Sequence, residues 1–411
     1  MRNKLFALVL VAVMLVMTGC KVQYEKEMPT EEPTTARPAS VTLKFRYYDE
    51  KLTGYLERCE RAFEQENEGV DIVLEQVDNV QYLETINKDS AKAETTPDLY
   101  ILEHDDLERA YLAGLAQKNN LTVYNTDNYC EAALNACSVK NQLVAYPLWY
   151  KTTFFLYNAD YVSERNVENF VTLEEFSQNV DFSTPETKSI KYIFKTNLTD
   201  LFMVYGFMGG EINIGGTTGD DRDAFELYNV KSQGSVDLFR ALIDFFRLET
   251  KSSYATCLKN FFNRVILSTV ASTDSIVQII KNGGHFGVTS FPYYDAVSKT
   301  SPLSITTGIV VNPYSANADI AGLFAKYVSY DMADQLFSSA SYFSCKRDVE
   351  YDIYTLNNMY SAYEKSTPKN KLAYGDQVYP LLEIAIHNII AGKDAKEELT
   401  SVEEYMKKQL R

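Results

Sequence analysis

The stretch "PDLYILEHDDLERAYLAGLAQ", residues 97–117, carries the pattern that decides the fold. A turn at its start leads into an apolar run, 99–102, which predicts a buried strand. Four polar residues, 103–106, end that strand, and 107–115 has the apolar spacing of a helix. A strand, a polar loop and a helix in this order form the repeating unit of a parallel α/β sheet.

The chain before this stretch repeats the same unit. Segments 41–48 and 70–77 have the composition of strands, and segments 51–66 and 82–92 have helical spacing. The order β-α-β-α-β-α predicts an α/β fold with helices on both faces of a sheet. Further strands are expected at 152–158 and 304–311, and further helices at 235–246, 318–330, 332–341 and from 379 onward.

Length and charge limit the class of protein. The 371 residues after position 40 exceed one ordinary domain and predict two lobes. Fifty-six acidic residues against 40 Lys and Arg give a net charge of −16, which argues against a nucleic-acid partner. The three histidines, His104, His285 and His387, do not cluster in the sequence, so we expect no multi-histidine metal site and no cofactor.

The first 40 residues predict a leader and a tether. Arg2 and Lys4 precede an apolar run, 5–17, which is shorter than the ~18–20 residues that a spanning helix needs. This arrangement is typical of a signal peptide, 1–20, and "MTGC" at 17–20 resembles a bacterial lipobox with Cys20 as the lipidated residue. An ordinary cleaved signal is the alternative. Residues 21–40, rich in Pro, Thr and Glu, predict a flexible tether that holds the body at a membrane.

Two features leave alternatives open. Cys59 lies on the apolar stripe of a predicted helix and is expected in the core, whereas Cys130 and Cys137 could form a local disulfide or stay free. The glycine-rich stretch 209–221 lacks the spacing of a phosphate-binding loop and is expected to be an ordinary loop. Three aspartates at its end could hold Ca²⁺ or be solvated turn residues: Asp220, Asp221 and Asp223.

Five stretches, taken in order, resemble one family. They are "PDLYILEHDDLERAYLAGLAQ" (97–117), "VAYPLWYKTTFFLYNADYV" (144–162), "HFGVTSFP" (285–292), "SITTGIVVNPYSANADIAGLFAKYVSYDMADQLF" (304–337) and "VYPLLEIAIHNIIAGKDAKEEL" (378–399). Each is similar to a segment of the extracellular solute-binding lipoproteins of ABC importers, in the maltose-binding-like group. No single stretch is specific to the family, but their order is.

The resemblance implies a two-lobe, periplasmic-binding-protein-like fold that closes on a ligand like a flytrap. Each lobe is then a sheet flanked by helices and is discontinuous in sequence. Lobe 1 is expected at 41–149 and 303–345, and lobe 2 at 150–302 and 346–411. The chain would cross between the lobes near 149–151, near 304–308 and after 345.

The resemblance also implies a function. The chain would capture a sugar or oligosaccharide between its lobes and deliver it to the transmembrane subunits of an ABC permease. It would be a monomer, not an enzyme, anchored by lipid on the extracytoplasmic face of the cell membrane. A lipid-anchored glycan-processing enzyme and a ligand sensor that feeds a histidine kinase are the alternatives, and a peptide or another polar solute stays possible as the ligand.

Ten residues are candidates for the ligand site. Sugars present C–H faces to aromatic rings and hydroxyls to carboxylates, so aromatic and acidic residues are favoured. Candidates follow the first strand (Tyr47, Tyr48, Asp49) and the third strand (Glu103, His104, Asp105). The resemblance adds Trp149 and Lys151 at the first crossing, Asp274 in "STDS" and Tyr379 at the start of a helix.

Six of these candidates have an alternative role. Asp105 could be a solvated residue at a helix N-terminus, Glu103 could form a salt bridge between the lobes, and His104 could be a surface imidazole. Trp149 could be a rigid plug at the hinge, and Tyr379 could be a core ring. Lys151 stands where maltose binders carry a carboxylate, so it would allow an acidic sugar or form an ion pair between the lobes.

Overall fold

The computed structural model describes residues 40–295 and 297–410. The predicted leader, Cys20 and residues 21–39 of the tether lie outside the described residues. The described residues form a compact unit that begins at Ser40.

Lobe 1 begins with the predicted β-α-β-α-β-α order. Its three parallel strands pair in the order β2-β1-β3. Strand β3 buries its first four residues and ends with Glu103 exposed to solvent, so its carboxyl end opens toward a polar region. The elements are β1 (Val41–Tyr47), α2 (Thr53–Glu66), β2 (Val70–Gln76), α3 (Tyr82–Asp89), β3 (Leu99–Glu103) and α4 (Leu107–Leu112).

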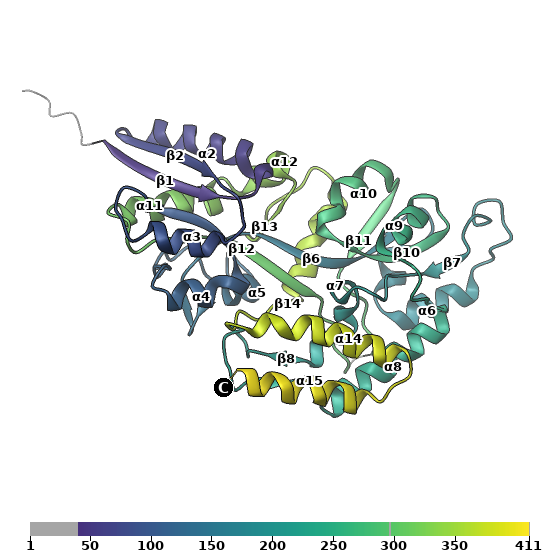
Figure 1. Ribbon diagram of the computed structural model, residues 1–411. Coiled ribbons are helices and arrows are strands. Elements are labelled where there is room, and N and C mark those ends of the chain that lie inside the picture. The colour runs from purple at the N-terminus through teal and green to yellow at the C-terminus, as the bar shows by residue number, and fades with distance from the viewer. Residues whose placement is uncertain (1–39, 296, 411) are drawn as a thin grey trace, which may run out of the picture. The chain divides into compact units, whose positions relative to one another are not determined.

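Two strands connect the lobes. Strand β6 (Tyr146–Asn158) is 13 residues long, and it extends the predicted strand 152–158 toward its N-terminus. Up to Thr152 it pairs with β12 (Leu303–Val311), and from Thr153 it pairs with β10 (Ile266–Ser272). The main path of the sheet is β2-β1-β3-β12-β6-β10-β7, which ends with β7 (Tyr192–Phe194), and three further short strands pair with β6 or β12. Figure 1 shows β6 running from one lobe into the other.

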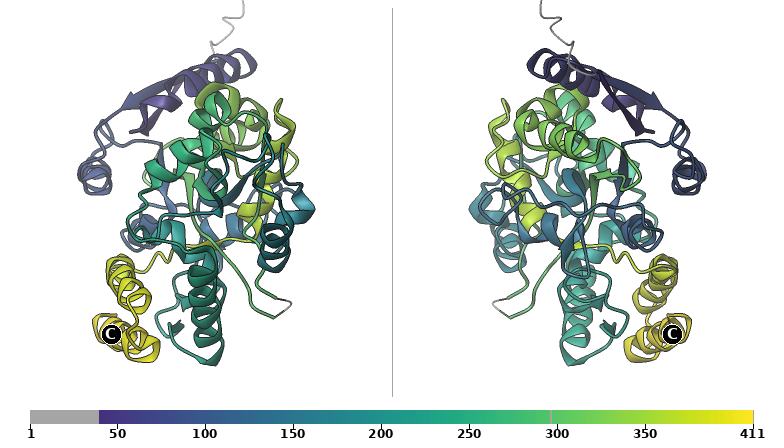
Figure 2. Two further views of the ribbon diagram at one scale, coloured as in Figure 1. Left: turned by 90° about the vertical axis from the view of Figure 1, so that its right-hand side faces the viewer. Right: turned by 90° about the vertical axis from the view of Figure 1, so that its left-hand side faces the viewer.

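Lobe 2 surrounds the second part of β6. Its longest helix, α8, begins at a capping box in which the Asn229 side chain accepts hydrogen bonds from two backbone N–H groups. The two C-terminal helices, α14 and α15, pack side by side (Figure 2). The elements are α6 (Phe170–Asn179), β7 (Tyr192–Phe194), α7 (Leu201–Val204), β8 (Asn213–Ile214), β9 (Phe225–Glu226), α8 (Val230–Phe246), α9 (Tyr254–Phe262), α10 (Ile276–Asn282), β11 (Phe286–Thr289), α14 (Val378–Ile390) and α15 (Ala395–Gln409).

The predicted helix 318–330 is interrupted. Helix α11 (Ala318–Lys326) is followed by a π-helical turn, Tyr327–Asp331. The hydroxyl of Tyr55 donates to the carbonyl of Val328 at 2.6 Å, and the hydroxyl of Tyr129 donates to that of Ser329 at 3.3 Å. The remaining elements are α5 (Glu131–Ala136), β4 (Ser138–Val139), β5 (Gln142–Leu143), α12 (Leu336–Ala340), β13 (Phe343–Ser344), α13 (Met359–Glu364) and β14 (Thr367–Pro368).

The apolar clusters of the core do not follow the division into lobes. One cluster runs from the lobe 1 helices and strands through the hinge, where it includes Trp149 (6 % exposed), into α9, β10, α10 and β11 of lobe 2. Another lies between β6, α8 and the C-terminal helices of lobe 2. Helix α13 joins the first cluster, because Tyr363 stacks on Tyr150 of β6 with ring centroids 3.9 Å apart. The boundary predicted at 149/150 stays a prediction, and the pairing of β6 changes between residues 152 and 153.

The sequence left two questions open, on the cysteines and on the aspartates after the glycine-rich stretch, and the structure gives both groups structural roles. Cys59 is buried, as predicted, and Cys130 and Cys137 are buried free thiols rather than a disulfide. Asp220 accepts a hydrogen bond from the backbone of Lys140, and Asp221 accepts one from the backbone of Asp223. Among the described residues, no three acidic, histidine or cysteine side chains are grouped as metal ligands. No helix within the described ranges is long and apolar enough to cross a membrane.

Candidate functional site

Two cavities lie at the carboxyl ends of β1 and β3, and both are lined by Glu103. The hinge cavity, about 140 Å³, is lined by residues after β1, by the crossing strands β6 and β12, and by the start of α10. The acidic cavity, about 550 Å³, is lined by residues of the returning segment 369–377 and by four residues at and after the end of β3: Glu103, Asp105, Asp106 and Arg109. We call the two cavities together the cleft. Their position beyond the strand ends is where open α/β sheets bind ligands.

Aromatic rings form one wall of the hinge cavity. Trp149 stacks on Tyr342 with ring centroids 4.9 Å apart and an angle of 15° between the planes. The Tyr342 hydroxyl donates a hydrogen bond to the carboxylate of Asp49. Burial, together with this bond to a carboxylate, raises the pKa of Tyr342 far above its usual value. Trp149 is therefore both a core residue and a wall of the cavity, and one face of its ring is covered by Tyr342.

Tyr342 was not among the sequence candidates. The sequence gives only weak evidence that Tyr342 belongs to the ligand site, because the pair Tyr342-Phe343 follows a helix and precedes the predicted third crossing. An aromatic pair at a crossing is consistent with core packing as well as with a ligand site. Only the stack on Trp149 and the bond to Asp49 show that Tyr342 belongs to the cleft.

Lys151 and Asp274 form an ion pair on the opposite wall. The Lys151 ammonium lies 2.5 Å from a carboxylate oxygen of Asp274. The two side chains are 40 % and 51 % exposed, so water screens the attraction and the pair contributes little to stability. Of the two roles predicted for Lys151, the structure shows an ion pair between the hinge strand and lobe 2.

Glu103 carries a carboxylate at the junction of the two cavities. No hydrogen bond or ion pair to its side chain exists within the described part of the chain. Although the side chain stays accessible to solvent, the protein packed around its carboxylate partly desolvates it and raises its pKa to about 7, and the negative charges of Asp105 and Asp106 add to that rise. The positive charges of Lys369 and Lys151 lower the pKa of Glu103, but they do not cancel the rise. Near neutral pH this group is therefore divided between its two protonation states.

Asp105 is held by a partner from the returning segment. The ammonium of Lys369 lies 2.8 Å from its carboxylate. Burial opposes ionisation of this carboxyl, but the positive charge of Lys369 overcomes that cost and holds the pKa of Asp105 below its usual value. The pair ties the loop after β3 to the segment after β14 and forms part of the wall of the acidic cavity.

His104 does not line either cavity. It is 1 % exposed, and its Nδ1 accepts a hydrogen bond from the backbone N–H of Thr306 at 3.0 Å. Its Nε2 therefore carries the proton and donates to the carbonyl of Lys369 at 2.8 Å. Burial lowers its pKa to about 4, although the nearby Asp105 charge favours protonation. His104 is a neutral connector between β3, β12 and the returning segment, which differs from the predicted ligand contact.

The three tyrosine candidates also lie outside the cavity walls. Tyr47 is 2 % exposed and bonds Thr53, because its side chain points to the core face of β1. Tyr48 packs edge-on against Tyr82 with centroids 5.0 Å apart. The Tyr379 hydroxyl accepts a hydrogen bond from the backbone N–H of Asn370 at 2.7 Å, so this ring supports the returning segment.

A second contact between the lobes lies beside the acidic cavity. The Glu108 carboxylate on α4 accepts hydrogen bonds from Arg222 at 3.0 and 3.2 Å and from the backbone of Ala373 at 2.6 Å. Lys371, which is fully buried, donates to three backbone carbonyls at the end of α5 and beyond it. We call this set of contacts, made by Glu108, Arg222, Lys371 and Ala373, the clasp. It holds the lobe 2 segments against lobe 1.

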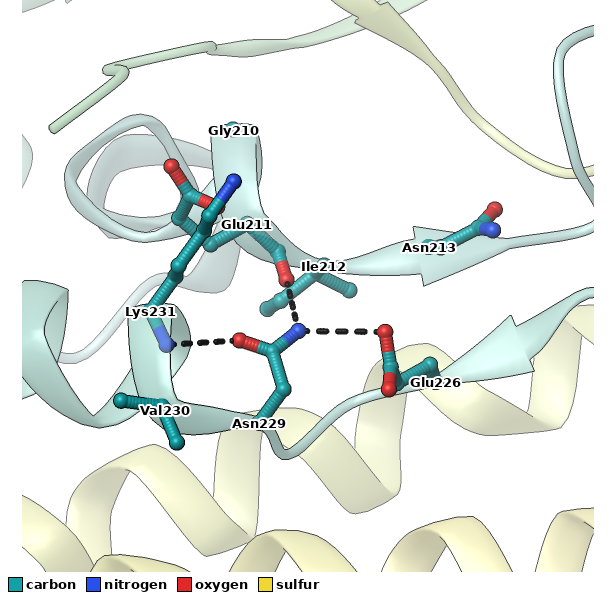
Figure 3. Close-up of a pocket in the computed structure, with 8 residues that line it drawn as sticks. All are labelled: Gly210, Glu211, Ile212, Asn213, Glu226, Asn229, Val230 and Lys231. Atoms are coloured by element: carbon teal, nitrogen blue, oxygen red, sulfur yellow. Dashed lines mark hydrogen bonds between the residues drawn. The ribbon is translucent and has the colours of Figure 1, made fainter. Parts of the chain in front are cut away.

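A further cavity of about 500 Å³ lies on lobe 2, away from the cleft (Figure 3). It is shallow and lined by β8, β9 and the start of α8. The amide of Asn229 already bonds the backbone of Lys231, the carbonyl of Glu211 and the carboxylate of Glu226. These groups cap the helix and satisfy one another, so this cavity offers no converging free polar groups.

Comparisons with known proteins identify a family for this chain and solved structures with the same fold. The family model described as "Bacterial extracellular solute-binding protein" matches residues 61–350. No curated protein matches significantly. Among solved structures, the extracellular solute-binding protein from Staphylococcus aureus in complex with maltose has a TM-score of 0.78 at 20 % identity, covering 90 % of this chain and 97 % of that one.

Two other structures show the same fold. A cyclo/maltodextrin-binding protein complexed with maltotetraose has a TM-score of 0.78 at 14 % identity, covering 92 % of this chain and 99 % of that one. The maltose-binding periplasmic protein from Listeria monocytogenes in complex with maltose has a TM-score of 0.74 at 19 % identity, covering 90 % and 98 %. The predicted two-lobe fold is confirmed, and since the family model spans most of the chain, this protein belongs to the bacterial extracellular solute-binding proteins.

Proposed function

We propose that this protein is the ligand-capturing component of an ABC importer and binds a sugar or oligosaccharide in the cleft between its lobes. The observation that carries the proposal is the hinge cavity, where the stacked pair Trp149 and Tyr342 faces carboxylates beyond the strand ends. Stacked rings and carboxylates are the groups that recognise the C–H faces and hydroxyls of sugars. The similar structures named above hold maltose or maltotetraose.

The ligand contacts that we propose are the cavity-lining residues. Six of them are sequence candidates, and Tyr342 is added from the structure: Asp49, Glu103, Asp105, Trp149, Lys151, Asp274 and Tyr342. We leave Tyr47, Tyr48, His104 and Tyr379 out of this set, because none of them lines either cavity.

The family places the protein outside the cytoplasm. We propose that lipid on Cys20 anchors it to the cell membrane, that residues 21–40 tether the body, and that lobes closed around the ligand dock on the permease subunits. The protein would act as a binder and not as an enzyme. Replacing Cys20 by Ser should release the protein from membranes, and unchanged membrane association of that variant would contradict the anchor.

Binding can be tested with the only tryptophan of the chain as reporter. Maltose, maltotetraose and cellobiose are titrated against the purified protein while Trp149 fluorescence and the melting temperature are followed. A bound sugar should change both signals, and a ligand at ~100 times its Kd should add about 2.7 kcal/mol of stability.

Two variants test whether the ligand binds in the cleft or elsewhere on the surface. Tyr342→Ala should weaken binding at least tenfold, because it removes an aromatic wall. Tyr354→Ala is the matched control, since Tyr354 is 85 % exposed and lines neither cavity. Equal affinities of the two variants would place the ligand elsewhere, and turnover of a sugar by the wild type would contradict the binding role.

A further inference from the structure

We infer that the solute bound in the cleft is a saccharide that carries a protonated amino group. The inference rests on the proposed function and narrows its substrate class. It follows from the balance of charges around the two cavities and from which of those charges are already paired.

The walls of the cleft carry more acid than base. Six carboxylates line the two cavities: Asp49, Glu103, Asp105, Asp106, Asp274 and Asp376. Only four basic side chains line them: Lys51, Arg109, Lys151 and Lys369. A concave site with a surplus of one sign attracts ligands of the opposite sign, because low-dielectric walls focus the field.

The basic side chains are largely committed to partners within the protein. Lys151 pairs with Asp274 at 2.5 Å and Lys369 pairs with Asp105 at 2.8 Å. Arg109 lies 2.6 Å from Asp106 and, on its other side, 2.6 Å from Glu84. At these three basic residues an acidic sugar would have to displace a carboxylate, so the structure disfavours the acidic ligand that Lys151 alone would allow.

The remaining basic residue does not reverse this balance. Lys51 makes no ion pair among the described residues, and its ammonium lies 5.6 Å from the centre of the Tyr342 ring at the rim of the hinge cavity. Asp49 accepts hydrogen bonds from the Tyr342 hydroxyl and from the backbone N–H of Lys51, and because both donors are uncharged, its negative charge stays in place. The surplus charge of the cleft therefore remains negative after all pairs are taken into account.

The free acceptor lies where a ligand would reach it from both cavities. Glu103 has no partner in the described chain and lines both the hinge cavity and the acidic cavity. An ammonium group placed there would gain an ion pair without breaking one. The stacked rings beside it suit a sugar ring and, through their negative faces, also a nearby cation.

The experiment compares disaccharides that differ only in the group at C2, which is charged in one of them and neutral in the other two. Calorimetric titrations at constant pH and ionic strength use cellobiose, the disaccharide of glucosamine, and its N-acetylated form, which share one linkage. Maltose and spermidine are included as a neutral sugar of another linkage and as an amine without a sugar ring. We expect the glucosamine disaccharide to bind at least tenfold more tightly than both of its uncharged analogues, and addition of salt to reduce this difference.

A pair of isosteric variants identifies the source of the preference. Glu103→Gln keeps the shape and hydrogen-bonding capacity of the side chain and should bring the charged and neutral disaccharides to similar affinity. Glu68→Gln makes the same change in net charge at an exposed site outside the cleft and should leave the preference intact. A preference that survives in Glu103→Gln would show that Glu103 is not its source.

The remaining outcomes separate this inference from the proposed function. If cellobiose or maltose binds as tightly as the glucosamine disaccharide, the charge inference is wrong and the sugar-binding function stands. If spermidine binds and no sugar does, the saccharide part of both proposals is wrong. If none of the five compounds binds, the amino-sugar inference fails, and a wider solute screen then decides the proposed function.

Discussion

At the scale of single residues, Trp149 performs two tasks that usually fall to different side chains. It is 6 % exposed and belongs to the apolar cluster of the hinge, yet it also lines the hinge cavity. A sequence can show that the chain has one tryptophan near a crossing. It cannot show that Tyr342, nearly 200 residues away, will cover one face of that ring, because no periodic pattern links the two positions.

Replacing Trp149 by Ala should destabilise the protein without ligand. The buried ring leaves a void that the hinge strands cannot fill, and large-to-small changes of this kind cost about 3–5 kcal/mol. Urea unfolding measures the loss. Tyr354→Ala, at an exposed site, should stay within about 0.5 kcal/mol of wild type. A loss below 1 kcal/mol for Trp149→Ala would show that the ring is not part of the core.

His104 should make stability fall in acid. Its pKa in the folded protein is about 4, below the ordinary value of 6.5, so the unfolded chain takes up the proton first. The contribution of neutral His104 to the free energy of unfolding is complete above pH 6.5 and is lost as the pH falls through 4.

A His104→Gln variant tests this prediction. Comparison with wild type at pH 7 and pH 4 should show that the wild-type advantage shrinks by about 3 kcal/mol. Equal pH dependence of the two proteins would contradict the role of His104.

Glu103 should have the opposite effect at higher pH. Its pKa is raised to about 7, so its contribution to stability is present below its ordinary pKa and is lost as the pH rises through 7. Wild type should therefore lose stability relative to Glu103→Gln between pH 5 and pH 8, as followed by melting temperature. Parallel curves for the two proteins would show that the raised pKa is incorrect.

At the scale of elements, the sequence predicted strands and helices well where one pattern decides the outcome. The strand expected at 99–102 is found as β3, Leu99–Glu103, and the helix expected at 51–66 is found as α2, Thr53–Glu66, because the burial of apolar residues determines both. The helix expected at 318–330 fails at Lys326, where tertiary contacts compete with the local pattern. Hydroxyls from Tyr55 and Tyr129 bond carbonyls of the π-helical turn, and these partners lie about 200 residues or more away in sequence.

Removing the Tyr55 hydroxyl should therefore destabilise this turn. Tyr55→Phe leaves the carbonyl of Val328 without its donor in a fully buried site, at a cost of about 1–3 kcal/mol. Chemical unfolding gives the magnitude, and Tyr405→Phe, which changes an exposed ring, serves as the control. If both variants unfold at the same urea concentration, the hydrogen bond contributes nothing and the turn has another cause.

At the scale of the whole molecule, the clasp joins the lobes through contacts that the protein makes with itself. Glu108 on lobe 1 pairs with Arg222 of lobe 2 at 3.0 Å and accepts from the backbone of Ala373. A ligand can shift an open–closed equilibrium only by its different affinity for the two states. Contacts within the protein that favour the closed state therefore reduce the free energy that ligand binding must supply to close the lobes.

Breaking the clasp should open the molecule. Glu108→Ala should increase the radius of gyration of the unliganded protein in X-ray scattering, and a saturating ligand should restore the smaller value. Glu397→Ala, an exposed change on α15, should leave both states unchanged. An unliganded Glu108→Ala protein as compact as wild type would show that the clasp does not control opening.

The order of strands in the sheet has a consequence for the newly made chain. Strand β12 lies between β3 and β6, yet it is made roughly 200 residues after β3. At a synthesis rate of ~5–20 residues per second, β3 waits on the order of 10–40 s for this neighbour, and β6, which ends about 145 residues before β12 begins, waits roughly 7–29 s. During that interval their edges are open to pairing with other nascent chains. The lobe whose helices and strands emerge first from the ribosome is therefore among the last parts of the molecule that can finish folding.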